Sequence, residues 1–309
     1  MNRELSRSLI KDYDLPIQFY DEPYFSYFVE LMDPYYKIKD KIKLMDIDLS
    51  LMSISEFASQ YRKVSERAIE TLKVNPAFKK FTEDTLSLIP PPQGFAQSQK
   101  LYTSSHKDQL ICSVDLVKAN FSVLLAHDSA MFDHAKTYEE WLSHFTSSKY
   151  LQGSKKIRQV IFGNLNPKRQ QTVQRHYMSW VKHYLMQAGL QESEILLASS
   201  DELAFMVQDP DSLTKKIQVA FSQPETVALS NFYRLNTFTL TKLHDNYEYF
   251  VKEYTNSACK IEFKNIPQNY LPQAIRHYRK EVVTELDRKF IVDGLMATFD
   301  EELFKKQSI

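Results

Sequence analysis

The chain has 309 residues, of which 43% are hydrophobic and 25% are charged. These are ordinary globular values, so the composition argues against a disordered protein, and the length predicts one to three domains with a sizeable core. The net charge is zero, which excludes a uniformly basic protein that coats nucleic acid. No apolar run approaches the roughly 20 residues of a membrane-crossing helix, so no membrane partner is expected.

Two further features indicate where the protein works. The first residues, Met1 to Tyr13, are charged and lack the apolar core of a signal peptide. Cys112 and Cys259 are too few for a disulfide framework or a thiolate metal site, which is typical of a reducing compartment. The sequence therefore predicts an intracellular protein, cytoplasmic or nuclear.

The N-terminal third is predicted to be helical. Ile54–Leu72 and Pro76–Leu88 carry apolar residues at three- and four-residue steps among charged ones. The prolines at 90 to 92 and Gly94 then break this pattern and mark the clearest internal boundary. Residues 1–92 are therefore expected to form a helical N-terminal region.

A strand and several helices follow this boundary. Leu110–Leu116 is β-prone, and Val117–Leu125 can turn directly into a helix. The helices expected next run over Tyr138–Phe145, from the N-cap Ser154 to Phe162, and from Pro167 to Gln187, which Gly189 closes.

The remainder of the chain changes to short apolar runs. Glu194–Ala198 and Leu203–Val207 predict a β-hairpin whose tip carries Asp201 and Glu202. Further strands are expected over Ile217–Phe221, Phe232–Leu243, Tyr247–Tyr254 and Lys260–Phe263, followed by a helix over Tyr270–Lys305. The predicted fold class is therefore α+β.

Positive charge is concentrated in the middle of the chain. Between Glu140 and Glu192 there is no Asp or Glu. In a neutral protein such a stretch concentrates positive potential, which attracts phosphates in a salt-dependent manner. Alternatively, acidic neighbours in space balance a solvated basic helix face. The basic residues of this stretch are Lys149, Lys155, Lys156, Arg158, Lys168, Arg169, Arg175 and Lys182.

Acidic residues flank the basic stretch on both sides. Asp115 ends the apolar strand, and Asp201 and Glu202 occupy the hairpin tip. Carboxylates brought together from a strand end and a hairpin tip can hold Mg²⁺ with a nucleotide's phosphates, and such ions assist phosphoryl transfer. Alternatively, Asp115 caps the following helix and Asp201 serves the turn. Of the two hairpin acids, Asp201 is favoured because its shorter side chain suits a ligand fixed by a tight turn.

The run from Lys155 to Gly163 has the sequence Lys-Lys-Ile-Arg-Gln-Val-Ile-Phe-Gly. On a helix, Lys155, Arg158, Gln159 and Phe162 are expected on one face. Cations there can meet triphosphate oxygens, while the aromatic ring and the glycine leave space for a base. The run resembles motif B of family B DNA polymerases, in which Lys is followed by Asn and then Tyr-Gly. Gln159 takes the Asn place, and Phe162-Gly163 takes the Tyr-Gly place.

The flanking segments follow the order of a polymerase palm. Ser113–Phe121 resembles motif A, and Ala198–Leu203 resembles the acidic hairpin of motif C. Tyr249–Tyr254 and Lys260–Ile266 resemble the strands that grip primer–template before the thumb. The likeness covers residues 105–285. Motif A lacks the Ser-Leu-Tyr-Pro sequence, motif C lacks Asp-Thr-Asp, and the chain has no room for an exonuclease domain.

This resemblance implies a palm with an antiparallel sheet over 93–267, small helical fingers inserted at about 130–190, and a helical thumb-like region over 268–309. Asp115 with Asp201 or Glu202 would bind metal and serve catalysis. The implied nucleotide-binding residues are Lys155, Arg158, Gln159, Phe162, Asn120 and Phe121, of which the last two would face the sugar. The implied nucleic-acid-binding residues are Lys156, Lys168, Arg169, Arg175, Lys182 and Lys252.

Three functions stay open at this point. The first is a polymerase-like nucleotidyltransferase that adds nucleotides to a 3′-hydroxyl with Mg²⁺, using a nucleoside triphosphate and DNA or RNA. The second is a non-catalytic nucleic-acid-binding protein that keeps the polymerase-like scaffold. The third is a structural or assembly protein whose basic face binds an acidic partner.

Overall fold

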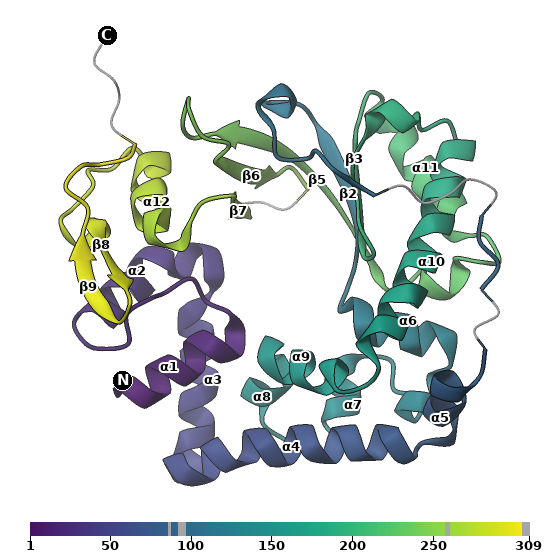
Figure 1. Cartoon of the computed structure of the whole chain (residues 1–309), viewed down its shortest axis with the longest axis horizontal. Helices are drawn as coiled ribbons and strands as arrows, with labels where there is room; N and C mark the ends of the chain where they lie inside the picture. The colour runs from purple at the N-terminus through teal and green to yellow at the C-terminus, as the bar shows by residue number, and fades with distance from the viewer. Residues whose placement is uncertain (86–87, 92–96, 257–259, 305–309) are drawn as a thin grey trace.

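The computed structural model describes residues 1–85, 88–91, 97–256 and 260–304. Pro92 and Gly94 of the expected boundary, Cys259, and Lys305 at the end of the expected last helix lie outside these ranges. The α+β class is confirmed, because helices surround a seven-stranded antiparallel sheet within the described residues (Figure 1). No helix in these ranges is long and apolar enough to span a bilayer.

The helical character of the N-terminal region is confirmed. A capping box between Ser53 and Glu56 starts its longest helix, and the Asn75 side chain accepts from the backbone N–H groups of Ala77 and Phe78 to start the last one. The helices are α1 (Arg3–Tyr13), α2 (Tyr24–Tyr36), α3 (Ile38–Leu51), α4 (Ile54–Val74) and α5 (Pro76–Glu83).

The middle of the chain forms one strand and then helices, as predicted. The Ser154 hydroxyl accepts a hydrogen bond from the Ile157 N–H at 3.2 Å, and Gly189 ends the long helix with a φ of +95°. The elements are β2 (Ile111–Leu116), α6 (Ala119–His127), α7 (Tyr138–Leu142), α8 (Lys149–Gly153), α9 (Lys155–Gly163) and α10 (Pro167–Gln187).

The main sheet has the strand order β1-β3-β4-β2-β5-β6-β7, and all its neighbouring strands are antiparallel. The expected acidic hairpin is therefore present, and it pairs with the strand that carries Asp115. The remaining strands of this sheet are β1 (Ser98–Gln99), β3 (Ile195–Ala198), β4 (Glu202–Met206), β5 (Tyr233–Lys242), β6 (Phe250–Tyr254) and β7 (Ile261–Lys264).

The two faces of this sheet differ. Val114, Leu203 and Phe205 belong to the large apolar core that the helices share. Ile111 and Ala204 lie on the opposite face, in a smaller cluster with Phe238, Leu240 and other apolar residues. Since side chains alternate along a strand, Asp115 shares the second face with Ile111, and Glu202 shares it with Ala204.

One strand prediction is wrong. Ile217–Phe221 forms the end of helix α11 (Pro210–Phe221) rather than a strand. Leu213, Ile217, Ala220 and Phe221 are all buried and follow a helical spacing. The short apolar run is thus one side of a longer amphipathic helix.

The prediction of a long C-terminal helix is also wrong. Helix α12 (Leu271–Arg279) stops at Lys280, which has a left-handed φ of +59°. A two-stranded sheet of β8 (Lys289–Val292) and β9 (Leu295–Thr298) follows. Its turn residues Asp293 and Gly294 both have positive φ, as the favoured two-residue hairpin turn requires. The Asp-Gly pair between two apolar runs is the signal that the sequence interpretation overlooked.

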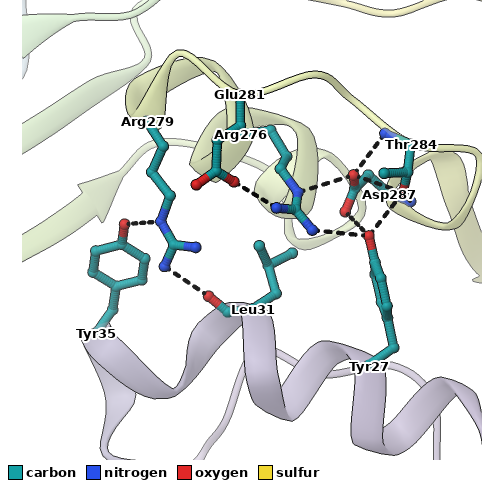
Figure 2. A network of polar contacts seen from close by, with 8 residues as sticks. All are labelled: Tyr27, Leu31, Tyr35, Arg276, Arg279, Glu281, Thr284 and Asp287. Atoms are coloured by element: carbon teal, nitrogen blue, oxygen red, sulfur yellow. Dashed lines mark hydrogen bonds and ion pairs between the residues drawn. The ribbon is translucent and has the colours of Figure 1, made fainter.

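Helix α12 and the hairpin after it return to the N-terminal helices (Figure 1). Figure 2 shows how they are joined: the fully buried Asp287 carboxylate accepts hydrogen bonds from the Tyr27 hydroxyl at 2.7 Å and from Arg276 Nε at 3.2 Å. The Thr284 N–H donates to it at 2.8 Å. Arg279 donates to the Tyr35 hydroxyl, also on α2. The hydroxyls of Tyr27 and Tyr35 therefore connect α2 to the C-terminal region, where Asp287 and Arg276 form a buried, hydrogen-bonded ion pair.

Replacing Asp287 with Ala should lower the free energy of unfolding by about 3 kcal/mol, because Arg276 keeps its charge but loses its buried partner. Urea unfolding of the two proteins measures this difference. The control is Glu281→Gln, which removes the more exposed ion pair of Arg276 and should cost about 0.5 kcal/mol. Equal losses in the two variants would contradict the structural importance of Asp287.

Candidate active site on the sheet

The strand end and the hairpin tip meet on one face of the sheet. Asp115 of β2 stands directly opposite Glu202 of β4 on one side and Arg234 of β5 on the other. Directly opposed residues on antiparallel strands have Cβ atoms about 5 Å apart and project from the same face. Two acids and one base therefore form a row across three neighbouring strands.

Asp201 has a different position from Glu202. Its backbone carbonyl accepts a hydrogen bond from the Leu116 N–H at 2.8 Å, which fixes the hairpin tip to the end of β2. Its carboxylate accepts from the Ser199 hydroxyl at 3.0 Å within the turn. The expectation that Asp201 is the acid that faces Asp115 is therefore wrong, because the strand register gives that position to Glu202.

The acid cluster is electrostatically unfavourable for Asp115. Burial, and then the negative charges of Glu202 and Asp201, raise the pKa of Asp115 to about 6, while Arg234 and Lys252 oppose the shift. No side chain in the described ranges donates a hydrogen bond to the Asp115 carboxylate. Like charges held together without a bonded counter-ion are the arrangement that a bound cation would relieve.

Lys252 of β6 lies next to this acid cluster. Its side chain is only 4% exposed, and its Nζ lies 3.9 Å from Glu202 Oε1 and 4.0 Å from the centroid of the Phe238 ring. Burial lowers the pKa of Lys252, while Glu202 and Glu262 oppose this shift. The expectation that Lys252 contacts nucleic acid is therefore wrong, because its ammonium group is buried on this face of the sheet and lies near Glu202.

The charged face continues onto β7. Glu262 stands opposite Lys252 and accepts a hydrogen bond from the Tyr254 hydroxyl at 2.8 Å. Burial alone would raise the pKa of Glu262, but Lys264 at 2.8 Å, the Tyr254 hydroxyl and Lys252 together outweigh it and hold that pKa at about 2. Acidic and basic side chains thus share this face of the sheet from β4 to β7.

The four residues singled out on the motif B-like helix are at helical spacing, but they have different surroundings. Phe162 is fully buried against Phe132 and Tyr138, so the expectation that it packs on a base is wrong. Gln159 is exposed, and Lys155 forms an ion pair of 2.6 Å with Asp14, the residue that follows α1. The helix instead packs against the N-terminal helices α1 and α4.

The expected sugar contact of Phe121 is also wrong. Its ring is 2% exposed and lies 4.6 Å from Phe132, centroid to centroid, in the helical core. Phe121, Leu124 and Leu125 form an apolar stripe at helical spacing, which could have revealed this burial. The neighbouring Asn120 accepts a hydrogen bond from Gln174 of α10 through its side-chain oxygen.

Lys118 is a residue that the sequence interpretation missed. It precedes α6 in a left-handed conformation, with a φ of +51°, three residues after Asp115. Its ammonium group pairs with Glu139 and lies 5.6 Å from the centroid of the Tyr138 ring. The Arg158 guanidinium lies 5.9 Å from the same centroid. One cation of the motif B-like helix and one that follows the acidic strand therefore lie near the same ring.

Other basic residues of the middle stretch are already engaged. Arg169 donates to the backbone carbonyl of Asp84 and lies over the Phe81 ring, and Lys182 is buried and pairs with Glu192. Acidic and carbonyl partners from other segments thus balance part of the stretch. Of the implied nucleic-acid-binding residues, Lys156, Lys168 and Arg175 are exposed and form no ion pair with any residue whose placement is described.

Comparisons with protein-family models, with curated proteins and with solved structures find no match for this chain. Within the described ranges, no group of three or more His, Cys, Asp or Glu side chains is arranged to hold a metal ion. The opposed pair Asp115 and Glu202 provides hard oxygen ligands from two side chains. Further oxygens for an octahedral cation would have to come from water or from substrate phosphates.

Asp115→Asn should stabilise the protein above pH 7. A carboxyl whose folded pKa is raised from about 3.8 to about 6 favours folding fully below pH 4 and loses that contribution as the pH rises through 6. Asparagine carries no charge, so the variant should gain about 1–2 kcal/mol at pH 8 and nothing at pH 4. Urea unfolding at both pH values measures the gain. The control Asp245→Asn changes an exposed carboxylate and should not reproduce this difference between the two pH values. An Asp115→Asn variant that is no more stable than wild type at pH 8 would contradict the electrostatic description.

Proposed function

We propose that this chain is a polymerase-like nucleotidyltransferase that extends a 3′-hydroxyl with nucleotides. The observation that carries the proposal is the opposition of Asp115 and Glu202 on one face of an antiparallel sheet whose other face is covered by helices. Their order along the chain, with an acidic strand, basic helices and then an acidic hairpin, is that of a polymerase palm. An intracellular location, where nucleoside triphosphates occur, belongs to the proposal.

The acid pair would act by binding Mg²⁺ together with phosphate oxygens of the substrate. The 3′-hydroxyl would lose its proton to water as its oxygen forms a bond to the α-phosphorus, while the bond from that phosphorus to the pyrophosphate oxygen breaks and pyrophosphate leaves. Lys118 and Arg158, whose cationic groups both lie near the Tyr138 ring, would contact the triphosphate and balance its charge. The protein's contribution would thus be positioning and electrostatics.

Nucleic acid would be held by the exposed cations of the middle stretch. Lys156, Lys168 and Arg175 are the candidates left after the internally paired residues are removed. Each contact with a backbone phosphate releases counter-ions, so binding would weaken steeply with salt. In this proposal the main sheet is the palm, α7 to α10 are the fingers, and α12 with β8 and β9 takes the thumb position.

A non-catalytic nucleic-acid-binding protein is the second candidate. Phe121 and Phe162 are buried, and Lys155 is paired with Asp14. Three of the expected nucleotide contacts are therefore unavailable in this arrangement. A protein that kept the scaffold and its exposed cations would still bind a primed template without extending it.

Extension of a labelled primed template with Mg²⁺ or Mn²⁺ tests the proposal. The wild-type protein should incorporate nucleotides, and Asp115→Asn or Glu202→Gln should reduce the rate by about 100-fold or more, because each removes a charge at the cation site. Asp201→Asn is the matched control and should keep most of the activity, since its carboxylate is turned to Ser199. Loss in Asp201→Asn with retention in Glu202→Gln would contradict the assignment.

Binding to the same primed template separates the two candidates. Salt-sensitive binding that charge reversal at Lys156, Lys168 and Arg175 removes, without incorporation under either metal, would support the non-catalytic protein. Absence of binding at low salt would contradict both candidates.

A further inference from the structure

A cleft of about 400 Å³ lies at the corner between α3 and α4, beside residues 145–148. Helix α4 runs along the lower edge of the molecule in Figure 1, whereas the sheet lies in the upper part. The cleft therefore belongs to a different surface from the acid pair. Its volume is within the range of ligand pockets, roughly 300–1,000 Å³.

The floor of the cleft is fixed by a buried polar contact. Asp48 on α3 is 5% exposed, and its carboxylate accepts a hydrogen bond from the Ser148 hydroxyl. The same hydroxyl accepts from the Leu151 N–H and so caps α8. Two segments that are 100 residues apart are thereby joined, and the cleft is preformed.

The walls combine apolar side chains with cations. Leu51, Met52, Val64 and Phe145 supply the apolar part. Leu51 is 78% exposed, and Ile47, one turn earlier on α3, is 57% exposed. Exposed apolar side chains gathered beside a preformed cleft are typical of a protein-binding surface.

The cations of the cleft are available to an anionic group. Lys63 and Arg67 line it one turn apart on α4, and within the described residues neither forms an ion pair. Their neighbour Arg62, outside the cleft, does pair with Glu66 at 3.4 Å. Two cations without an ion-pair partner among the described residues thus stand where the apolar lining begins.

We propose that this cleft binds a short acidic segment of a partner protein that inserts a large apolar side chain. Leu51, Met52, Val64 and Phe145 would receive the apolar side chain, and Lys63 and Arg67 would pair with flanking carboxylates. Single-stranded nucleic acid fits less well, because its repeated phosphates require a track of cations with stacking platforms. Here two cations border an apolar cleft that also contains the Asp48 carboxylate. This inference is independent of the proposed catalytic function.

A display library of random 12-residue peptides, panned against the intact protein, tests the inference. Enriched peptides should combine Asp or Glu with Trp, Phe or Leu. Synthetic copies should bind Lys63→Glu/Arg67→Glu and Leu51→Asp at least tenfold more weakly than wild type by fluorescence anisotropy. Lys73→Glu, an exposed cation on α4 outside the cleft, is the control and should change affinity less than twofold.

Three outcomes would overturn the inference: no enrichment, enriched peptides that are basic, or acidic peptides that bind both cleft variants as tightly as wild type. A 20-nucleotide oligothymidine is the competing probe. If the Lys63→Glu/Arg67→Glu change weakens only this oligonucleotide, the occupant is nucleic acid and not a peptide. All the substituted side chains are exposed, and matching circular dichroism spectra confirm that the variants are folded.

Discussion

The register between β2 and β4 is the constraint on which the candidate site depends. Slipping this pairing by one residue would turn Asp115 or Glu202 into the helical core, because side chains alternate along a strand. Val114, Leu203 and Phe205 prevent the slip, since they must stay buried on the helical face. The apolar pattern of the core therefore holds two carboxylates opposite each other despite their repulsion. That repulsion, added to burial, is the reason why the pKa of Asp115 is raised.

Contacts between the N-terminal helices and the C-terminal region hold the two ends of the described chain together. Arg276 and Asp287 join the C-terminal region to Tyr27 of α2, 260 residues before Asp287 (Figure 2). A buried charge pair of this kind adds little net stability over an apolar contact, but removing one partner is costly. It therefore specifies one arrangement of the two ends. In the proposed polymerase-like arrangement this contact would set the position of the thumb relative to the N-terminal helices.

The sequence was most informative where structure is local. Ser154 as an N-cap, Gly189 as a helix terminator and the hairpin around Asp201 all follow from short-range backbone preferences. The errors arose where distant residues decide: Phe121 and Phe162 look available in sequence, but they pack on Phe132 and Tyr138. Lys252 is likewise enclosed by strands that only the tertiary fold brings together. The choice of Glu202 over Asp201 opposite Asp115 depends on a one-residue register that alternating apolar residues define only once β2 and β4 are known to pair.

The central claim is that Asp115 and Glu202 together form a cation site, and carboxyl carbon-13 NMR of Asp115 tests it most directly. Asp12 is an internal control, because burial raises its pKa to about 6 as well, against the hydrogen bond from Tyr150, and it lies on α1 away from the sheet. A cation held between the two acids should lower the pKa of Asp115 by about one unit or more when Mg²⁺ is added, and leave that of Asp12 unchanged. Equal titration curves for Asp115 with and without Mg²⁺, or equal shifts at Asp115 and Asp12, would contradict the account.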